Sequence, residues 1–431
     1  MKRIGLSEKL LSNGLTVIHI QTGPSVIFEA SVHFPVGSRH EPENQSGMTH
    51  LLEHMMFRGC GPYPKSTEFS KRLESICGET NAFTSAESTE FWFQCAASHH
   101  VECLELLGHF LTSPNFGEFE IERRIITSEL DEDYNEAGAL IDDYSLAMKT
   151  HFGTRGLGMP IGGTQAGVNS ISIEDMKSYR EKWYIPQNAI LTLQSGFSPE
   201  QIFQECETIF GSWRSKDMAQ PKASERLAPQ TPNAAGPHRV AVNDSNNQFS
   251  LRISFAVPYD SSNSEIIPAM EIIERLLDDG SASRLQTKVR EEKGLVYSIA
   301  AQLDEFADAL VFGIDAIVAP DQVIETCNEV TAQLHALVHS GPSPEELDHY
   351  VHRACFELEK LDERHHDFLE RIVSGRFQSR AFDKDRQTAA YRSLTTQAAQ
   401  NAAARIFKAQ QQSIVLVGPK AEDWIGKLAT V

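Results

Sequence analysis

Residues 47–59 read GMTHLLEHMMFRG, a largely apolar run that no glycine or proline interrupts between its two ends. Such a run predicts a helix. His50 and His54 are four residues apart, just over one helical turn, so both imidazoles project from one face within reach of a single metal ion. Glu53 lies beside that face, where its carboxylate can hold a water molecule against the metal and take its proton during attack on a carbonyl.

The second half of the chain repeats this pattern. Residues 271–280 (EIIERLLDDG) match residues 50–59 (HLLEHMMFRG) at an offset of 221 residues. The apolar run ILTLQSG that ends at Gly196 is echoed by IVLVG, which ends at Gly418, an offset of 222 residues. Two matches at nearly the same offset predict a duplicated α/β unit, although amphipathic helices and apolar strands also resemble one another by chance.

The alternation of short β-type runs with longer helical stretches predicts an α+β fold. It would consist of two structurally similar α/β-sandwich domains, each a mixed sheet with helices. Strands are expected at residues 15–20, 30–34 and 189–194, and helices at 48–58, 67–77 and 121–130. Residues 215–238 contain four prolines among Lys, Ser, Ala and Gln, which predicts a linker between domains 1–214 and 239–431. In the second domain, Glu271 and Arg275 stand where the first has its two histidines.

Composition restricts the partners and the compartment. The 431 residues include 39 Lys and Arg against 59 Asp and Glu, a formal net charge of −20. This charge repels phosphate backbones and anionic lipids, which argues against nucleic acid and membrane surfaces as partners. Seven widely spread cysteines indicate reduced core thiols. The N-terminus meets charged residues before any apolar run, and no stretch approaches transmembrane length, so a cytoplasmic protein is expected.

A catalytic zinc site needs a third protein ligand. The predicted helix at residues 121–130 carries Glu122 and Glu129, seven residues apart and therefore on one face. Spacing alone does not choose between these two glutamates, and it leaves the acidic residues 131–133 open as well. Without the histidines, a solvated acidic face would be the more ordinary interpretation. The paired histidines at 99–100 and 365–366 have no carboxylate or third ligand at suitable spacing and are expected at the surface.

The His-x-x-Glu-His motif at residues 50–54 is the inverted zinc-binding motif of the inverzincins. Its surroundings resemble the pitrilysin and mitochondrial-processing-peptidase family, in its small bacterial two-domain type. The resemblance extends over residues 36–41 and 47–59, the segment GETNAFTS at 78–85, the pair Glu122 and Glu129, and the Tyr-x-Pro-x-Asn pattern at 184–188. It implies a zinc-dependent endopeptidase with one zinc ion (Zn2+) per chain, although manganese or cobalt could occupy the same ligands.

Roles for individual residues follow from this resemblance. His50, His54 and Glu129 would be the zinc ligands. Glu53 would be the catalytic base that activates a zinc-bound water and later protonates the leaving amine. Glu122 would support the site electrostatically from outside the ligand set.

The resemblance also implies two substrate-binding elements. The first is a strand whose edge would bind an extended peptide through main-chain hydrogen bonds. It comprises Asn81, Ala82, Phe83 and Thr84. The second is the pair Arg290 and Tyr297, which would face the zinc site and bind the substrate carbonyl as charge develops on it. Taken alone, Asn81 would also fit a turn, and Arg290 would also fit a solvated helix end.

The size of the chain predicts how these elements meet. In long single-chain members of the family, the zinc site and the Arg/Tyr pair lie in opposite halves, each about as long as this entire chain. The resemblance therefore implies a homodimer in which Arg290 and Tyr297 of one chain serve the zinc of the other. The enclosed chamber would admit short or unfolded peptides. A heterodimer with a related subunit is the alternative.

The function that follows is zinc-dependent cleavage of peptides in the cytoplasm. A narrower version is the processing of a leader peptide or a modified peptide, which nothing in the sequence selects over general peptide turnover. Two rival functions keep the same fold. One is a non-catalytic core or assembly subunit, against which the intact motif and Glu129 argue. The other is one subunit of an obligate heterodimeric peptidase.

Overall fold

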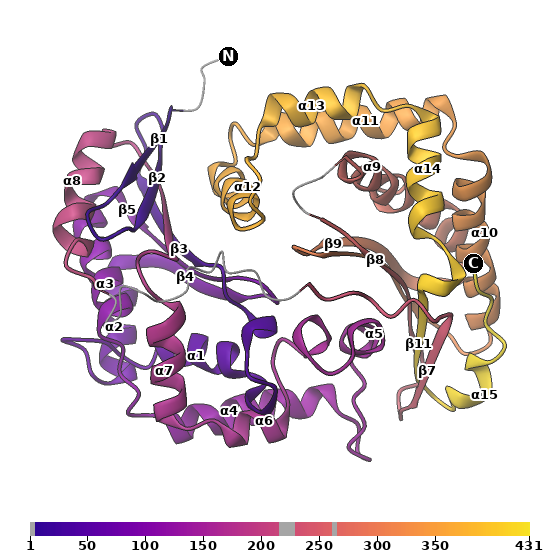
Figure 1. Cartoon of the computed structure of the whole chain (residues 1–431), viewed down its shortest axis with the longest axis horizontal. Helices are drawn as coiled ribbons and strands as arrows, with labels where there is room; N and C mark the ends of the chain where they lie inside the picture. The colour runs from indigo at the N-terminus through magenta and orange to yellow at the C-terminus, as the bar shows by residue number, and fades with distance from the viewer. Residues whose placement is uncertain (1–4, 215–228, 261–264) are drawn as a thin grey trace. The chain divides into compact units, whose positions relative to one another are not determined.

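The computed structural model describes residues 5–214, 229–260 and 265–431 (Figure 1). Most of the predicted linker, residues 215–228, lies outside the described residues. The described chain packs into two compact units. Unit 1 takes its described residues from Met1–Leu130, Met159–Ala228 and Arg364–Phe377, and unit 2 from Asp131–Gly158, Pro229–Glu363 and Gln378–Val431. Residues 131–158 thus pack with unit 2, and residues 364–377 pack with unit 1. The domain limits 1–214 and 239–431 stay a prediction.

Unit 1 is a six-stranded sheet with helices. Its strands are β1 (Gly5–Leu10), β2 (Thr16–Gln21), β3 (Ile27–Phe34), β4 (Cys77–Thr84), β5 (Thr89–Ala96) and β6 (Ile190–Ser195). The strands lie in the order β1-β2-β6-β3-β5-β4, so β4 is an edge strand. The helices are α1 (Met48–Met56), α2 (Ser66–Ile76), α3 (His100–Thr112), α4 (Phe119–Leu130), α6 (Gln165–Ser170), α7 (Ile173–Trp183), α8 (Pro199–Phe210) and α12 (His365–Phe377). One large hydrophobic core joins the sheet to α1, α3, α7 and α8.

Unit 2 contains a five-stranded sheet. Its strands are β7 (His238–Asn243), β8 (Phe249–Pro258), β9 (Val296–Glu305), β10 (Ala309–Val318) and β11 (Gln412–Gly418), in the order β7-β11-β8-β10-β9. The α-helices are α5 (Asp143–Phe152), α9 (Ile267–Asp278), α10 (Val323–Ser340), α11 (Pro344–Lys360), α13 (Lys384–Arg392), α14 (Thr396–Ile406) and α15 (Glu422–Ile425). A π-helical segment, Gln286–Glu291, precedes β9.

The two sheets share one topology, which confirms the predicted α+β fold of two similar domains. Read in chain order, β2 to β6 take the same places in their sheet as β7 to β11 take in theirs. In each sheet the first and last of these strands pair in parallel, and all other pairs are antiparallel. Helix α9 follows β8 as α1 follows β3. The register therefore supports the duplication that the repeated segments predict.

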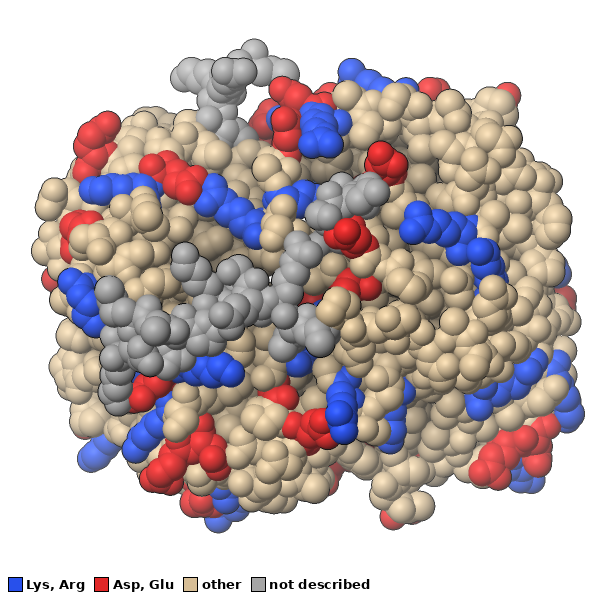
Figure 2. Space-filling view, viewed as in Figure 1, with Lys and Arg blue, Asp and Glu red and all other residues tan. Residues whose placement is uncertain are grey.

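The predicted strands and helices are found within one to three residues of their expected ends. All seven cysteines are buried free thiols, as expected. Within the described ranges, no helix is both long and apolar enough to cross a membrane. Acidic and basic side chains are interspersed over the face shown in Figure 2, among larger areas of uncharged residues.

The expectation that the paired histidines lie at the surface is wrong for His100, and His366 is only partly exposed. The side chain of His100 is only 12% exposed, and its ring stacks on Phe197 with centroids 4.0 Å apart. His366 is half-buried, and its Nδ1 lies 2.9 Å from a carboxylate oxygen of Glu29. These partners lie 97 and 337 residues away along the chain, so local spacing could not reveal them.

Candidate active site

Helix α1 begins where Gly47 permits a sharp turn. Gly47 has a φ of 98°, and a Cβ there would lie 2.8 Å from the Gly162 carbonyl oxygen. The buried carboxylate of Glu41 accepts hydrogen bonds from the backbone N–H groups of Gly47 (2.7 Å) and Thr49 (2.8 Å). These bonds satisfy N–H groups that a helix N-terminus leaves without partners. One face of the helix packs into the hydrophobic core, and its buried residues are Met48, Leu51, Leu52, Met55 and Met56.

The opposite side of α1 carries His50, Glu53 and His54. The two imidazole rings lie with centroids 4.6 Å apart, and Glu129 reaches them from the last turn of α4. His54 Nε2 is 4.0 Å from Glu129 Oε2, and one ligand atom from each of the three predicted zinc ligands lies within 4.8 Å of the others. The structure thus brings together His50, His54 and Glu129.

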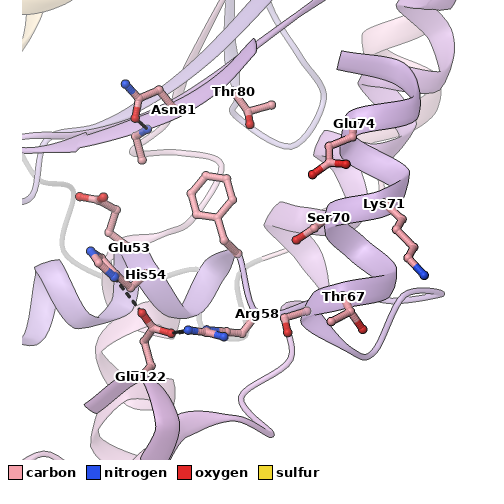
Figure 3. A pocket seen from close by; sticks show the side chains of 13 residues that line it. Glu53, His54, Arg58, Thr67, Ser70, Lys71, Glu74, Thr80, Asn81 and Glu122 are labelled. Carbon is pink, nitrogen blue, oxygen red and sulfur yellow. Dashed lines mark hydrogen bonds and ion pairs between the residues drawn. The ribbon is translucent and has the colours of Figure 1, made fainter. Parts of the chain in front are cut away.

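Glu122 contacts His54 on the side of the ring opposite Glu129. It is buried, and its carboxylate lies 2.8 Å from His54 Nδ1 (Figure 3). The same carboxylate is paired with Arg58, which also contacts Glu118 at 3.3 Å. A carboxylate at this position favours the tautomer with the proton on Nδ1, which leaves the Nε2 lone pair facing Glu129. Glu122 therefore orients His54, and Arg58, whose role was not evident from the sequence, holds Glu122 in place.

These residues fit a zinc ion. Two imidazoles and one carboxylate form the ligand set of a catalytic zinc site with one position left open. Burial lowers the pKa of His50 to about 4, so this ring is neutral and able to bind metal near pH 7. Burial also disfavours charge on His54, but its hydrogen bond to Glu122 and the nearby Glu129 raise the pKa of His54. The carboxylates that favour a positive charge on His54 would also favour a metal cation beside it.

Glu53 lies next to the ligand group and is partly buried. Burial raises its pKa, while a hydrogen bond donated by the Thr84 hydroxyl opposes this rise. A carboxylate whose pKa is raised accepts a proton more readily than an ordinary glutamate, as a general base requires. The bond from Thr84, which was expected only to bind substrate, also joins α1 to the end of strand β4.

A pocket of about 710 Å³ opens beside Glu53 and His54. In Figure 3, α2 forms one wall with Thr67, Ser70 and Glu74, and β4 forms another with Thr80 and Asn81. Because β4 is an edge strand, the N–H and C=O groups along one of its sides do not pair with another strand of the sheet. This strand contains Asn81, Ala82, Phe83 and Thr84. The side chain of Phe83 is 63% exposed, which is unusual for so large an apolar group.

Arg290 and Tyr297 belong to unit 2. Arg290 lies in the π-helical segment, exposed, with its Nη1 3.3 Å from the Gln286 side-chain oxygen. Tyr297 lies near the start of β9 and is 78% exposed. Both side chains are thus available for contact, and their approach to a zinc site stays a prediction.

Comparison with known proteins gives the family. Residues 16–158 match the model of the insulinase family, peptidase family M16, and residues 170–353 match the model described as the peptidase M16 inactive domain. The chain belongs to peptidase family M16. An uncharacterized zinc protease of Streptomyces coelicolor is 27% identical to this M16 chain over 347 residues, which cover 79% of the chain and 74% of that protein.

Solved structures share the M16 fold. The crystal structure of a protease from Helicobacter pylori superimposes with a TM-score of 0.88 at 21% identity, covering 97% of this chain and all of that one. The periplasmic protease PqqL from Escherichia coli matches with a TM-score of 0.77 at 17% identity. That match covers all of this chain but only 49% of PqqL. The M16 chain described here therefore corresponds in fold to about half of the longer protein.

Proposed function

We propose that this M16 chain is a zinc-dependent endopeptidase that cleaves short or unfolded peptides. The observation that carries the proposal is the convergence of His50, His54 and Glu129 beside the carboxylate of Glu53, at the mouth of a pocket bordered by an edge strand. Membership of a family whose relatives are named zinc proteases supports the same chemistry. One zinc ion in this site is the proposed cofactor.

The proposed roles follow from the geometry of unit 1. Zinc bound by the three ligands would lower the pKa of water and polarise a peptide carbonyl. Glu53 accepts the proton of the attacking water and then donates it to the leaving amine. Thr84 holds Glu53 through its hydroxyl, and Glu122 holds the ring of His54.

The edge of β4 supports peptides as the substrate class. An extended peptide can add to this edge by main-chain hydrogen bonds, which recognise an extended backbone more than a particular sequence. Residues 81–84 would form this contact, with the exposed ring of Phe83 packing against substrate. Short and unfolded peptides can adopt this extended form without first unfolding. Processing of a leader or modified peptide is the narrower form of the proposal.

The proposed assembly is a homodimer with sites completed in trans. Its support is the exposure of Arg290 and Tyr297 and the correspondence of this chain to about half of PqqL. A guanidinium and a phenol near the scissile carbonyl would stabilise the developing oxyanion. Mixing two inactive variants, Glu53→Gln and Arg290→Ala, tests this arrangement. After subunit exchange, one intact site in each mixed dimer should restore about a quarter of the wild-type activity. Completion in cis predicts no recovery.

The catalytic proposal is tested by Glu53→Gln, assayed on a mixed quenched-peptide library. The variant should retain zinc in the α1 site, because Glu53 is not in the ligand set, and should lose cleavage by at least about 1,000-fold. Glu120→Gln, an exposed glutamate of α4 with a 71% exposed side chain, is the matched control and should cleave normally. Normal turnover by Glu53→Gln would remove the proposed base from the mechanism.

A second candidate is a subunit that needs a catalytic partner. It is favoured by the match of residues 170–353 to a model named for an inactive domain. In α9, Glu271 is bonded to Tyr391 and Gln387 instead of facing a metal group. Zinc binding without cleavage by the purified wild-type chain would support this candidate over the homodimer. We place either form in the cytoplasm, which its seven buried free thiols support.

A further inference from the structure

A second cluster of metal-ligating side chains lies in unit 1, on the sheet face turned away from α1. Alternate residues of β3 from Phe28 to Phe34 join the hydrophobic core, so His33 projects from the opposite face. Glu90 of β5 is its partner in the antiparallel register, and α12 brings Glu370 to the same place. His33 Nδ1 lies 3.3 Å from Glu370 Oε1 and 3.9 Å from Glu90 Oε1. The three ligand atoms lie within 4.8 Å of one another.

The hydrogen bonds around His33 determine which ring nitrogen faces the cluster as an acceptor. Nε2 lies 2.9 Å from the Thr192 hydroxyl, and that hydroxyl donates its only proton to the Ser31 carbonyl oxygen at 3.4 Å. Thr192 must then accept from His33, so Nε2 carries the hydrogen of the neutral ring. Nδ1 consequently directs a lone pair toward the two carboxylates. His33 is only 3% exposed, and such burial favours the neutral imidazole.

The carboxylate oxygens that face Nδ1 lack donors. Glu90 Oε1 and Glu370 Oε1 are shielded from solvent and have no hydrogen-bond partner among the described residues, although the Ser31 side chain interacts with the Glu90 carboxylate. The two carboxylates also approach each other. Three hydrogen-bond acceptors therefore converge on one buried point. This arrangement costs free energy unless a proton or a cation lies between them. A proton shared by the carboxylates, or a bound cation, would satisfy it.

The charges around the cluster match a divalent cation. His366, one turn before Glu370 on α12, lies 2.9 Å from a carboxylate oxygen of Glu29, so a carboxylate already balances that imidazole. Without a cation, burial raises the pKa of both the Glu90 and the Glu370 carboxyl, although the charge of His366 opposes this rise. With a divalent cation bound between them, both carboxylates would be ionised and would supply two negative charges. One imidazole nitrogen and two carboxylate oxygens are ligands that zinc and its neighbours among the transition metals accept.

We propose that His33, Glu90 and Glu370 bind a divalent transition-metal cation of the zinc class, in addition to the catalytic zinc. The residues come from two neighbouring strands and from a helix some 270 residues later in the chain. A cation held between them would fasten α12 to the unit 1 sheet, a structural role instead of a catalytic one. The proposal uses none of the residues assigned to catalysis and does not depend on peptidase activity.

The test measures zinc binding after the α1 site has been destroyed. The chain with His50→Ala and His54→Ala is depleted of metal and dialysed against buffered zinc, and its metal content is measured by mass spectrometry. We expect about one zinc per chain to remain. Adding Glu370→Gln should weaken this binding at least about 10-fold. Asp367→Asn, an exposed acidic residue on the same helix, is the matched control and should leave the binding unchanged.

Thermal unfolding supplies a second readout. Zinc should raise the melting temperature of the chain that lacks the two α1 histidines, and this increase should disappear when Glu370→Gln is added. If Glu370→Gln does not fold, as judged by circular dichroism, Glu90→Gln takes its place. The proposal is overturned if the chain without the α1 histidines binds no zinc. It is also overturned if folded Glu370→Gln or Glu90→Gln binds zinc as tightly as Asp367→Asn does.

Discussion

Replacing Glu122 by Gln isolates what a buried carboxylate contributes to a metal site that it does not itself ligate. Glu122 lies 2.8 Å from His54 Nδ1 and also pairs with Arg58. Burial alone would raise its pKa, but the hydrogen bond to His54 and the charge of Arg58 lower it, so Glu122 is ionised at neutral pH. The amide of Gln keeps nearly the same shape and can still accept the proton of Nδ1–H. The substitution therefore removes charge while it leaves an acceptor in place.

The expected loss follows from that difference. Removal of a residue that holds a metal ligand in place typically lowers metal affinity 10- to 100-fold, which corresponds to about 1.4–2.7 kcal/mol of binding free energy. A charge-assisted hydrogen bond is about twice as strong as a neutral one, so Gln should retain part of the effect. We therefore expect Glu122→Gln to weaken zinc binding about 10-fold, and Glu122→Ala to approach 100-fold. Arg58 keeps its contact with Glu118, which limits the effect on folding.

The assay is reactivation of the metal-depleted enzyme in buffered zinc, followed by peptide cleavage. The midpoint of reactivation reports on the α1 site alone, because only that site is proposed to act in catalysis. Glu118→Gln is the matched control: it removes a carboxylate from the same arginine without touching His54, and its midpoint should stay within about twofold of wild type. Equal midpoints for wild type and Glu122→Gln would refute the reasoning, as would an equal loss in Glu118→Gln.

Two further predictions concern the neighbours of the site. Thr84→Val removes the hydroxyl that stabilises the charged form of Glu53; the pKa of Glu53 should therefore rise further, and the acid limb of the pH profile of kcat/KM should move to higher pH. An unchanged acid limb would show that Glu53 is not the titrating base. Gly37→Ala places a Cβ 2.1 Å from the Ser85 carbonyl oxygen and should lower the free energy of unfolding, measured in urea, by about 1–3 kcal/mol. Gly78 has open space around it, so the control Gly78→Ala should change the free energy of unfolding by less than about 1 kcal/mol.

Much of the fold could be predicted from the sequence because its signals are local. Short apolar runs determine strands such as β2 and β6, and the longer apolar run of α1 determines a helix. The repeated segments at nearly the same offset predicted two similar domains, and the matching order of the two sheets confirms them. The exchange of residues 131–158 and 364–377 between the units left no such local signal. It depends on which surfaces these segments bury after the chain has folded.

For the candidate site, the sequence alone determined that His50 and His54 share a face, because a separation of four residues fixes that relation in any helix. It could not decide between Glu122 and Glu129, which share a face of their own helix. Only the packing of α4 against α1 places Glu129 toward Nε2 of His54 and Glu122 against Nδ1. The cluster of His33, Glu90 and Glu370 had no signal in the sequence, because its members come from separate elements. Local periodicity sets the direction of a side chain along its own helix or strand, but only tertiary packing decides which distant side chain it meets.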